Sequence, residues 1–220
     1  MTAVTPELLS RFDIPGPRYT SFPTADRFVE AFGADDYILA LEQRKAHTGA
    51  RALPLSVYVH VPFCESLCYY CACNKIVTKH HEKAAEYLDY LARELTMHTA
   101  HCGKGQVVSQ LHLGGGTPTF FSDAELQQLM ALMREHFKLD TAGEYSIEVD
   151  PRTVSNERLK VLKDMGFNRL SFGVQDFDPA VQKAVHREQP AGQVFALVAE
   201  ARRLGFVSIN VDLIYGLPKQ

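Results

Sequence analysis

A unit of strand, loop and helix recurs along the chain from residue 53 onward, and this repetition restricts the possible folds more than any other feature of the sequence. The first unit has an apolar, β-branched run, LPLSVYVHV at 53–61, then a loop, then a helical pattern at 81–98 in which Leu88, Leu91 and Leu95 share one face. Strands that alternate with helices of this length pair in parallel through right-handed crossovers. The sequence therefore predicts an α/β fold, either a (β/α) barrel or an open doubly wound sheet.

The second unit has a strand at 106–113 and a helix opened by Ser122 and Glu125, whose spacing is that of a capping box. The expected buried stripe of this helix is Leu126, Leu129, Met130 and Met133.

The later units have predicted strands at 145–150, 168–175 and 207–216 and helical patterns at 155–165 and 178–204. We expect the last helical stretch to be interrupted near Pro190, and Gly166 and Gly205 to take the left-handed conformation that ends helices.

The predicted barrel is incomplete. A full eight-stranded barrel takes roughly 250 residues, whereas this chain has 220 and stops directly after its fifth strand. We therefore expect about five strands of a truncated barrel at 53–220, with the edge of the fifth strand exposed. Residues 1–52 are expected to form an N-terminal arm, extended by the three prolines within 11–28, and one helix within 34–49, capped by Asp35 or Asp36 and ended by Gly49.

Composition and charge exclude several classes of function. The fractions of hydrophobic residues, 46%, and of charged residues, 22%, are those of a soluble globular protein. The net charge is -3 and the basic residues are scattered, so we expect no nucleic-acid partner. No apolar run approaches the roughly eighteen residues of a membrane span, and the N-terminus has no basic segment followed by an apolar one. We therefore expect a cytoplasmic protein without a membrane partner.

Four of the five cysteines lie between residues 64 and 73, in the loop after the first predicted strand. Cys64, Cys68 and Cys71 form a CxxxCxxC pattern, and three such thiolates can each bind one iron of a four-iron cluster, which leaves the fourth iron open to a small molecule. The alternative is a structural zinc site completed by His60, His80 or His81. The remaining cysteine, Cys102, is expected to be a small buried hydrophobic residue.

Each predicted strand is followed by a residue or loop suited to a ligand, at the carboxyl ends where (β/α) barrels build their sites. These features are the cysteine loop, the segment 114–117 (Gly-Gly-Gly-Thr), Glu148, Gln175 and Asp212. Ordinary alternatives stay open: the glycines can simply turn the chain, Asp212 can act as a cap or pair locally, and Gln175 can be a solvated turn residue.

The CxxxCxxC loop, with Tyr70 directly before Cys71, resembles that of the radical S-adenosylmethionine (SAM) superfamily. Within it, four stretches resemble the oxygen-independent coproporphyrinogen III oxidases (dehydrogenases) of haem synthesis. They are PRYTSFPT at 17–24, VHVPFCESLCYYCACNKI at 59–76, LHLGGGTPTF at 111–120, and GVQDF with VHREQ and DLIYGLPKQ further on. The stretch PRYTSFPT at 17–24 and Cys73 match the oxidases, whereas the related haem-chaperone proteins differ at both places. By this resemblance the chain is an N-terminal fragment.

The resemblance implies a 4Fe-4S cluster held by Cys64, Cys68 and Cys71, with two S-adenosylmethionine molecules per chain. The residues implied to contact the first S-adenosylmethionine, the one on the cluster, are Tyr58, Tyr70, Gly115 and Glu148. The residues implied to contact the second S-adenosylmethionine are Gly116, Thr117, Gln175, Arg187 and Asp212. Packing remains an alternative for Tyr58, a solvated charge for Arg187, and a spare or substrate-facing thiol for Cys73.

The implied activity is that of a radical SAM oxidoreductase that converts propionates of coproporphyrinogen III to vinyl groups and gives protoporphyrinogen IX. The cofactor generates the radical, so no catalytic side chain is expected. The implied partners are the tetrapyrrole, for whose carboxylates Arg11, Arg18 and Arg27 are candidates, and an electron donor protein. Alternatively these arginines form a charged arm on the barrel. We expect the full-length protein to be a monomer and this fragment to bind a cluster without turning over. The rival hypotheses are a haem-chaperone relative that binds haem without decarboxylation and a zinc-stabilised domain.

Overall fold

The computed structural model of the chain describes residues 5–13, 24–46 and 53–220. Its centre is a five-stranded sheet with the order β1-β4-β5-β6-β7, in which every neighbouring pair is parallel. The strands are β1 (Leu55–Val61), β4 (Gln106–Gly115), β5 (Phe137–Val149), β6 (Arg169–Gln175) and β7 (Ser208–Leu213). The helices between them are α3 (Lys83–Cys102), α4 (Asp123–His136), α5 (Asn156–Asp164), α6 (Pro179–Ala184) and α7 (Ala191–Arg203).

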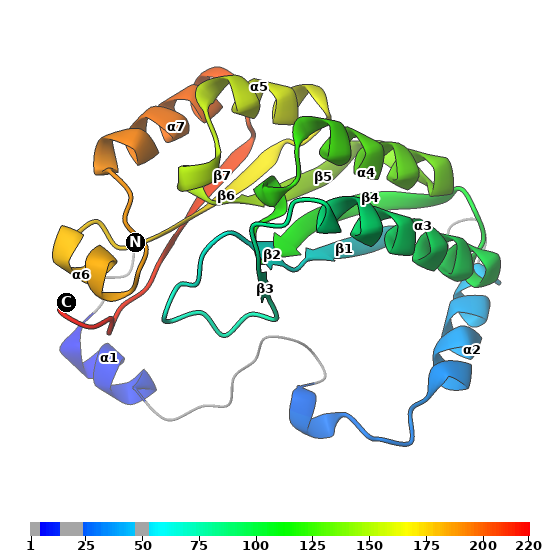
Figure 1. The fold of residues 1–220 in the computed structure, drawn as a ribbon. Helices are drawn as coiled ribbons and strands as arrows, with labels where there is room; N and C mark the ends of the chain where they lie inside the picture. The colour runs from blue at the N-terminus through cyan, green and yellow to red at the C-terminus, as the bar shows by residue number, and fades with distance from the viewer. Residues whose placement is uncertain (1–4, 14–23, 47–52) are drawn as a thin grey trace.

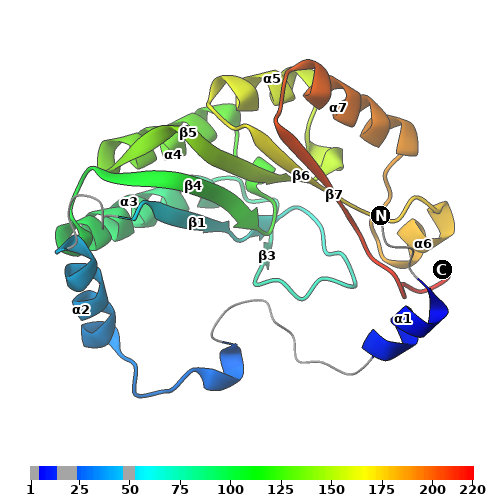
Figure 2. The ribbon, with the colours of Figure 1, turned by 180° about the vertical axis from the view of Figure 1, so that it is seen from behind.

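The strands follow one another across the sheet in chain order, and this order decides between the two predicted architectures. A doubly wound sheet reverses its strand order at one point and carries helices on both faces. Here the order never reverses, and α3, α4, α5 and α7 arch over one face of the curved sheet (Figure 1). The opposite, concave face is turned away from these helices (Figure 2). The fold is therefore the partial (β/α) barrel that the sequence predicts.

The hydrophobic core lies between the sheet and this helix layer. From α3 it receives Leu88, Leu91 and Leu95, as predicted. The whole predicted stripe of α4, which is Leu126, Leu129, Met130 and Met133, is also buried. The strands alternate accordingly, because Leu170, Phe172 and Val174 of β6 face the helices while the residues between them face the concave side.

Several local predictions are confirmed. Ser122 caps α4, with its hydroxyl accepting from the N–H of Glu125 at 3.3 Å, while the Glu125 carboxylate accepts from the N–H of Ser122 at 2.8 Å. Gly166 and Gly205 have positive φ angles of 108° and 74°. The last helical stretch is divided as expected, with α6 ending at Ala184 and α7 beginning directly after Pro190.

Three local features differ from the predictions. Strand β5 begins at Phe137 rather than near Tyr145, because Phe137–Leu139 pairs with the start of β4 before the register shifts. The helix α2 (Ala34–Lys45) is capped by Gly33, and the Asp36 carboxylate accepts from the N–H of Gly33 at 2.9 Å rather than serving as the N-cap itself. The predicted stop at Gly49 lies outside the described residues.

The third difference is a short parallel pair that the sequence did not predict. It joins β2 (Phe63–Cys64) to β3 (Ile76–Val77).

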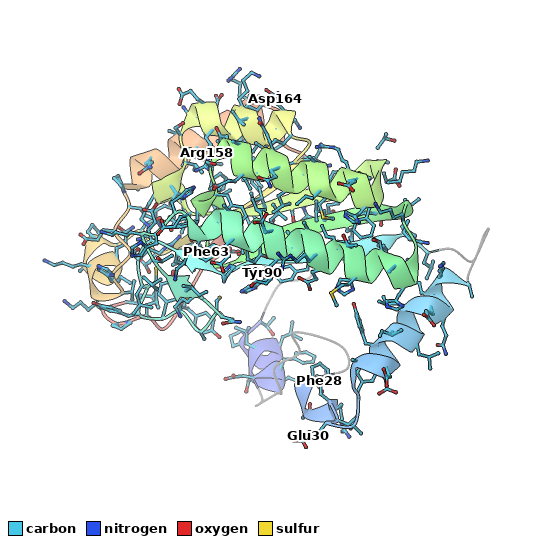
Figure 3. The ribbon with its side chains drawn as sticks, turned by 45° about the vertical axis from the view of Figure 1, so that its right-hand side comes forward. Phe28, Glu30, Phe63, Tyr90, Arg158 and Asp164 are labelled. Atoms are coloured by element: carbon cyan, nitrogen blue, oxygen red, sulfur yellow. The ribbon has the colours of Figure 1, made fainter. Side chains whose placement is uncertain are left out.

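The described N-terminal elements are α1 (Pro6–Phe12), the short helix η1 (Ala25–Arg27) and α2. Helix α2 contacts α3, where the Tyr37 hydroxyl lies 3.2 Å from Nδ1 of His98. Phe28 and Glu30, between η1 and α2, lie apart from the sheet and its helices (Figure 3). The predicted domain boundary at residue 53 stays a prediction. Among the described residues, no helix combines the length and the apolar character needed to cross a membrane.

Candidate functional site

The cysteine loop is closed at its base by the β2–β3 pair, at the carboxyl end of β1. The N–H of Ile76 donates to the carbonyl of Pro62 at 2.7 Å, and the N–H of Thr78 donates to the carbonyl of Cys64 at 2.9 Å. These bonds hold the end of the loop beside its beginning, next to the carboxyl end of β1. The thiols are therefore held beside the strand ends and not on a free loop.

The cysteines of the loop are free of disulfide bonds and differ in burial. Cys68 is buried, Cys64 and Cys71 are half-buried, and Cys73 is exposed. The Cys64 sulfur lies 3.5 Å from the hydroxyl of Thr117, which follows β4. Cys64 and Cys68 line a cavity of about 360 Å³ together with residues of other strand ends. The loop and the sheet edge thus form one site.

Burial raises the pKa of the Cys64 thiol; a hydrogen bond from Thr117 lowers it, and the neighbouring Cys71 and Cys68 raise it again. Burial also raises the pKa of Cys73, with Cys71 adding to the effect. A thiol with a raised pKa needs a positive partner to be held as a thiolate. Metal binding here would therefore release protons.

The donor set fits an iron-sulfur cluster. Two guanidinium groups donate toward the buried Cys68 sulfur, Nη1 of Arg187 at 3.5 Å and Nη2 of Arg152 at 3.8 Å, and can offset the negative charge of a cluster. In the described ranges, no three His, Cys, Asp or Glu side chains are arranged around a single metal ion. The ligands of a cube bind different irons and do not have to converge on one point.

The three histidines considered as zinc ligands are bonded to other groups. Nε2 of His60 donates to the carbonyl of Asn74 at 2.8 Å, His80 pairs with Glu82, and His81 pairs with Glu125. Each would have to leave its partner to reach a metal.

A second cavity, of about 280 Å³, adjoins the first at the carboxyl ends of the strands. Gly116, Thr117, Asp150 and Arg187 line both cavities. The second is lined by eight of the nine residues predicted to bind S-adenosylmethionine: Tyr70, Gly115, Gly116, Thr117, Glu148, Gln175, Arg187 and Asp212. Cys73 lies on the same lining. Residues from segments up to 142 positions apart, from Tyr70 to Asp212, therefore meet in one place.

The glycine segment packs against the cysteine loop. A Cβ on Gly116 would lie 2.7 Å from the carbonyl oxygens of Pro62 and Phe63, a distance that real Cβ atoms do not tolerate. Gly115 has a φ of 116°, and its N–H donates to Oε2 of Glu148 at 3.1 Å. The glycines therefore bring β4, the cysteine loop and Glu148 together, which is more than turning the chain.

Tyr58 is the one predicted residue outside the lining of the second cavity. It lies on the concave face of β1, 56% exposed, with its hydroxyl donating to Nδ1 of His60 at 2.9 Å and its ring stacked on His112. Burial raises the pKa of Tyr58, and the charge of Glu148 adds to the effect. Its ring and the Glu148 carboxylate flank Gly114, where a Cβ would lie 3.0 Å from each. Tyr58 is thus beside the cavity and not packed in the core.

Arg187 is buried rather than solvated, with its side chain only 9% exposed. Besides Cys68, it binds the Asp150 carboxylate at 3.2 Å and, through Nε, the carbonyl of Gly173 at 3.2 Å. The alternative of a surface charge is wrong. For Asp212 the local pairing considered above is present, because Ser171 donates to its carboxylate at 3.1 Å. Gln175 ends β6 with a φ of 71°.

Two residues of the site were missed from the sequence, Asp150 and Arg152. Both directly follow β5, in the segment Asp-Pro-Arg, where Asp150 caps the short helix η4 (Pro151–Thr153). Their position after a strand is the same signal that indicated Glu148 and Gln175. Arg152 reaches Cys68, which is 84 residues away in the sequence, and no local pattern shows that proximity.

Two curated relatives of the chain carry the same name. The oxygen-independent coproporphyrinogen III oxidase of Pseudomonas aeruginosa is 51% identical over 217 residues, 97% of this chain and 46% of the relative. The Escherichia coli protein of the same name is 50% identical over 213 residues, 97% of this chain and 45% of the relative. The chain thus spans about half the length of the curated relatives it matches. These relatives are named as oxidases, which does not favour the haem-chaperone hypothesis.

Among solved structures, the coproporphyrinogen III oxidase of Escherichia coli, described as a radical SAM enzyme, superposes with a TM-score of 0.84 at 51% identity. The match covers 92% of this chain and 45% of that one. A sequence model of the Radical SAM superfamily matches residues 58–220, from β1 through the last strand. With a match over most of its length and the cysteine loop beside the strand ends, this chain belongs to the Radical SAM superfamily.

Proposed function

We propose that the chain is the N-terminal part of an oxygen-independent coproporphyrinogen III oxidase, which converts propionates of coproporphyrinogen III to vinyl groups and yields protoporphyrinogen IX. The observation that carries the proposal is the meeting of the cysteine loop with a polar cavity at the carboxyl edge of one parallel sheet. The substrate is taken from relatives that are about half identical along nearly the whole chain.

In this proposal Cys64, Cys68 and Cys71 hold a 4Fe-4S cluster, and the adjoining cavity takes S-adenosylmethionine. When bound, these groups supply a carbon-centred radical that can remove a hydrogen atom from an unactivated C–H bond. This chemistry requires no side-chain base. The chain's own contribution is to bind and orient the cofactor and the substrate and to shield them from water.

Each group of residues has a physical role in that arrangement. Glu148, fixed by the N–H of Gly115 and by Nε2 of His112 at 3.4 Å, offers its remaining acceptor capacity to paired ribose hydroxyls. Tyr70 and Tyr58 flank the cavity as apolar surfaces for the nucleoside and methionyl portions. Gly116, Thr117, Gln175, Arg187 and Asp212 are proposed to line a second S-adenosylmethionine position, because a substrate that loses two carboxyl groups needs two radical equivalents.

The proposed partners are the tetrapyrrole and an electron donor protein. Arg11 and Arg27 lie in the N-terminal elements, and Arg27 pairs with Asp26 at 3.3 Å, so the bond of Arg27 would have to yield to a substrate carboxylate. Arg18 lies outside the described residues. We further propose that the full-length protein acts as a monomer in the cytoplasm, without a nucleic-acid or membrane partner.

The test is anaerobic reconstitution of the chain with iron and sulfide, followed by metal analysis and visible and EPR spectra with and without S-adenosylmethionine. About four irons and a spectral change on adding S-adenosylmethionine are expected, and both are lost in Cys68→Ala. Cys73→Ala should keep the iron. The full-length protein, given coproporphyrinogen III and a reductant, should form protoporphyrinogen IX. Stoichiometric zinc without iron would overturn the proposal, as would haem binding without product.

A further inference from the structure

Arg152 has an arrangement that cofactor binding as proposed above does not explain. Its guanidinium binds Asp150 through Nε at 3.0 Å and through Nη2 at 2.7 Å, and Nη2 also reaches the sulfur of Cys68 at 3.8 Å. It lines the cavity that contains Cys64 and Cys68, but not the adjoining cavity assigned to S-adenosylmethionine. Its contacts therefore point to the sulfur side of the site.

Asp150 holds two guanidinium groups in place beside that sulfur. Its side chain is 6% exposed, and its Oδ2 accepts from both Arg152 and Arg187 while its Oδ1 accepts from Arg152. Burial opposes the charge of Asp150, but the hydrogen bond from Arg152 and the charge of Arg187 keep the pKa of this carboxyl below its ordinary value. Two positive groups and one negative group thus leave a net positive charge next to Cys68.

A net positive charge and N–H donors at a cluster sulfur have a defined effect on electron uptake. Reduction adds one negative charge to an iron-sulfur cluster, and hydrogen bonds to the sulfurs together with net charge set its potential. In a partly buried site this electrostatic effect is larger than in water. A donor that favours the reduced form makes the midpoint potential less negative.

We propose that Arg152, oriented by Asp150, is a positioning residue that donates to the Cys68 sulfur and raises the reduction potential of the cluster. The inference rests on the proposed function, because it requires a cluster at Cys64, Cys68 and Cys71. The step it affects is the transfer of one electron from a low-potential one-electron donor to the cluster. No bond forms or breaks in that transfer, and the guanidinium stays protonated.

The competing explanation is purely structural: Arg152 only fastens η4 to Asp150. The two explanations differ in what they predict for Arg152→Lys and Arg152→Gln. A redox role gives a graded change in potential, because lysine keeps the charge but loses the planar fork, and glutamine loses the charge. A structural role lowers stability and leaves the potential where it was.

The experiment is an EPR-monitored redox titration of the reconstituted chain, without S-adenosylmethionine, in parent, Arg152→Gln, Arg152→Lys and Arg169→Gln. Arg169 is the matched control, since it is also a half-exposed guanidinium paired with a carboxylate, Glu144. It lies at the amino end of β6, whereas the site lies at the carboxyl ends of the strands. We expect a more negative midpoint in Arg152→Gln, a smaller shift in Arg152→Lys, and none in Arg169→Gln. Urea unfolding of the metal-free proteins measures the structural contribution separately.

Equal midpoints in parent and both Arg152 variants, with full iron content, overturn this inference and leave the proposed function intact. If Arg152→Gln does not fold, Arg152→Lys decides alone, and an unshifted midpoint there also overturns the inference. A shift of the same size in Arg169→Gln does so too, because the effect would then be one of overall charge. A parent chain that binds no iron overturns the inference and the proposed function together.

Discussion

Gly116 lies where the loop after β4 passes against the cysteine loop, and it has no room for a larger residue. In Gly116→Ala the new Cβ would press on the backbone oxygens of Pro62 and Phe63, which are not free to move away as a flexible side chain would be. We expect the free energy of unfolding of the metal-free chain to fall by about 1–3 kcal/mol and its capacity to take up iron to fall with it.

The matched control for this substitution is Gly192→Ala, in α7. A Cβ there meets nothing within 4 Å, so stability should stay the same or rise by up to about 1 kcal/mol. Urea denaturation and iron analysis measure both variants. Full iron uptake and unchanged stability in Gly116→Ala would show that the two loops do not depend on this contact.

Asp150 is the buried carboxylate on which the two guanidinium groups depend, and its removal should be costly. Asp150→Asn leaves Arg152 and Arg187 without their negative partner, so we expect a loss of about 3 kcal/mol at neutral pH. The folded-state pKa is lowered from the ordinary 3.8, so the stabilisation is present above that value and is lost as the pH falls through the folded pKa.

Denaturation of the metal-free chain in urea at a series of pH values from 7 to 3 checks this expectation. The parent should lose stability toward the acid end more steeply than Asp150→Asn. Asp164→Asn, at an exposed pair with Lys160, should change stability by less than about 0.5 kcal/mol. Parallel pH curves for parent and Asp150→Asn would contradict the assignment of a charged, paired carboxylate.

At this scale the sequence predicts residues whose chemistry and local position are both distinctive. The CxxxCxxC spacing, the glycines and Glu148 stand at strand ends and were found in that way. Arg152 was not, because its contact with Cys68 exists only after the ends of β1 and β5 are brought together with β4 between them. Its position after β5 marks it as a strand-end residue, but nothing in the local sequence shows that it reaches Cys68.

Among the elements, α4 offers the clearest test of local stabilisation. Its first turn is closed by the reciprocal Ser122 and Glu125 bonds, and His81 adds a third contact to the Glu125 carboxylate at 2.8 Å. Ser122→Ala removes the acceptor for the N–H of Glu125 and should lower the free energy of unfolding by about 1 kcal/mol. Thr96→Ala, within α3, should change little or stabilise slightly. Equal effects in the two variants, measured by urea denaturation, would show that the cap contributes nothing specific.

The elements that were predicted well are those specified by local signals. The capping box, the leucine stripe of α3 and the glycines after α5 and α7 each act within a few residues. The early part of β5 and the β2–β3 pair are different, since each exists because a partner strand lies alongside it. Gly143 interrupts the apolar pattern of β5, and only the pairing of Phe137–Leu139 with β4 makes the preceding segment a strand.

For the whole molecule, the repeated unit predicted the partial barrel, while the choice between a barrel and a doubly wound sheet needed the strand order. Both folds share the strand-helix alternation, and only the direction in which each new strand is added separates them. The same order explains the exposed edge that the sequence predicted, because among the described strands β7 pairs only with β6.

The free edge of β7 carries a prediction about association of the chain. In the part of the chain that the structure describes, no strand pairs with its backbone on that side, and Val211 and Leu213 are 42% and 62% exposed, so the edge is a template for pairing with another copy. We expect this chain to self-associate as its concentration rises, and Val211→Lys to reduce association by placing a charge in the new interface. Met97→Lys adds the same charge at an exposed position of α3 and should leave association unchanged. Sedimentation velocity over a concentration series measures all three proteins, and equal association in parent and Val211→Lys would mean that copies of the chain meet through another surface.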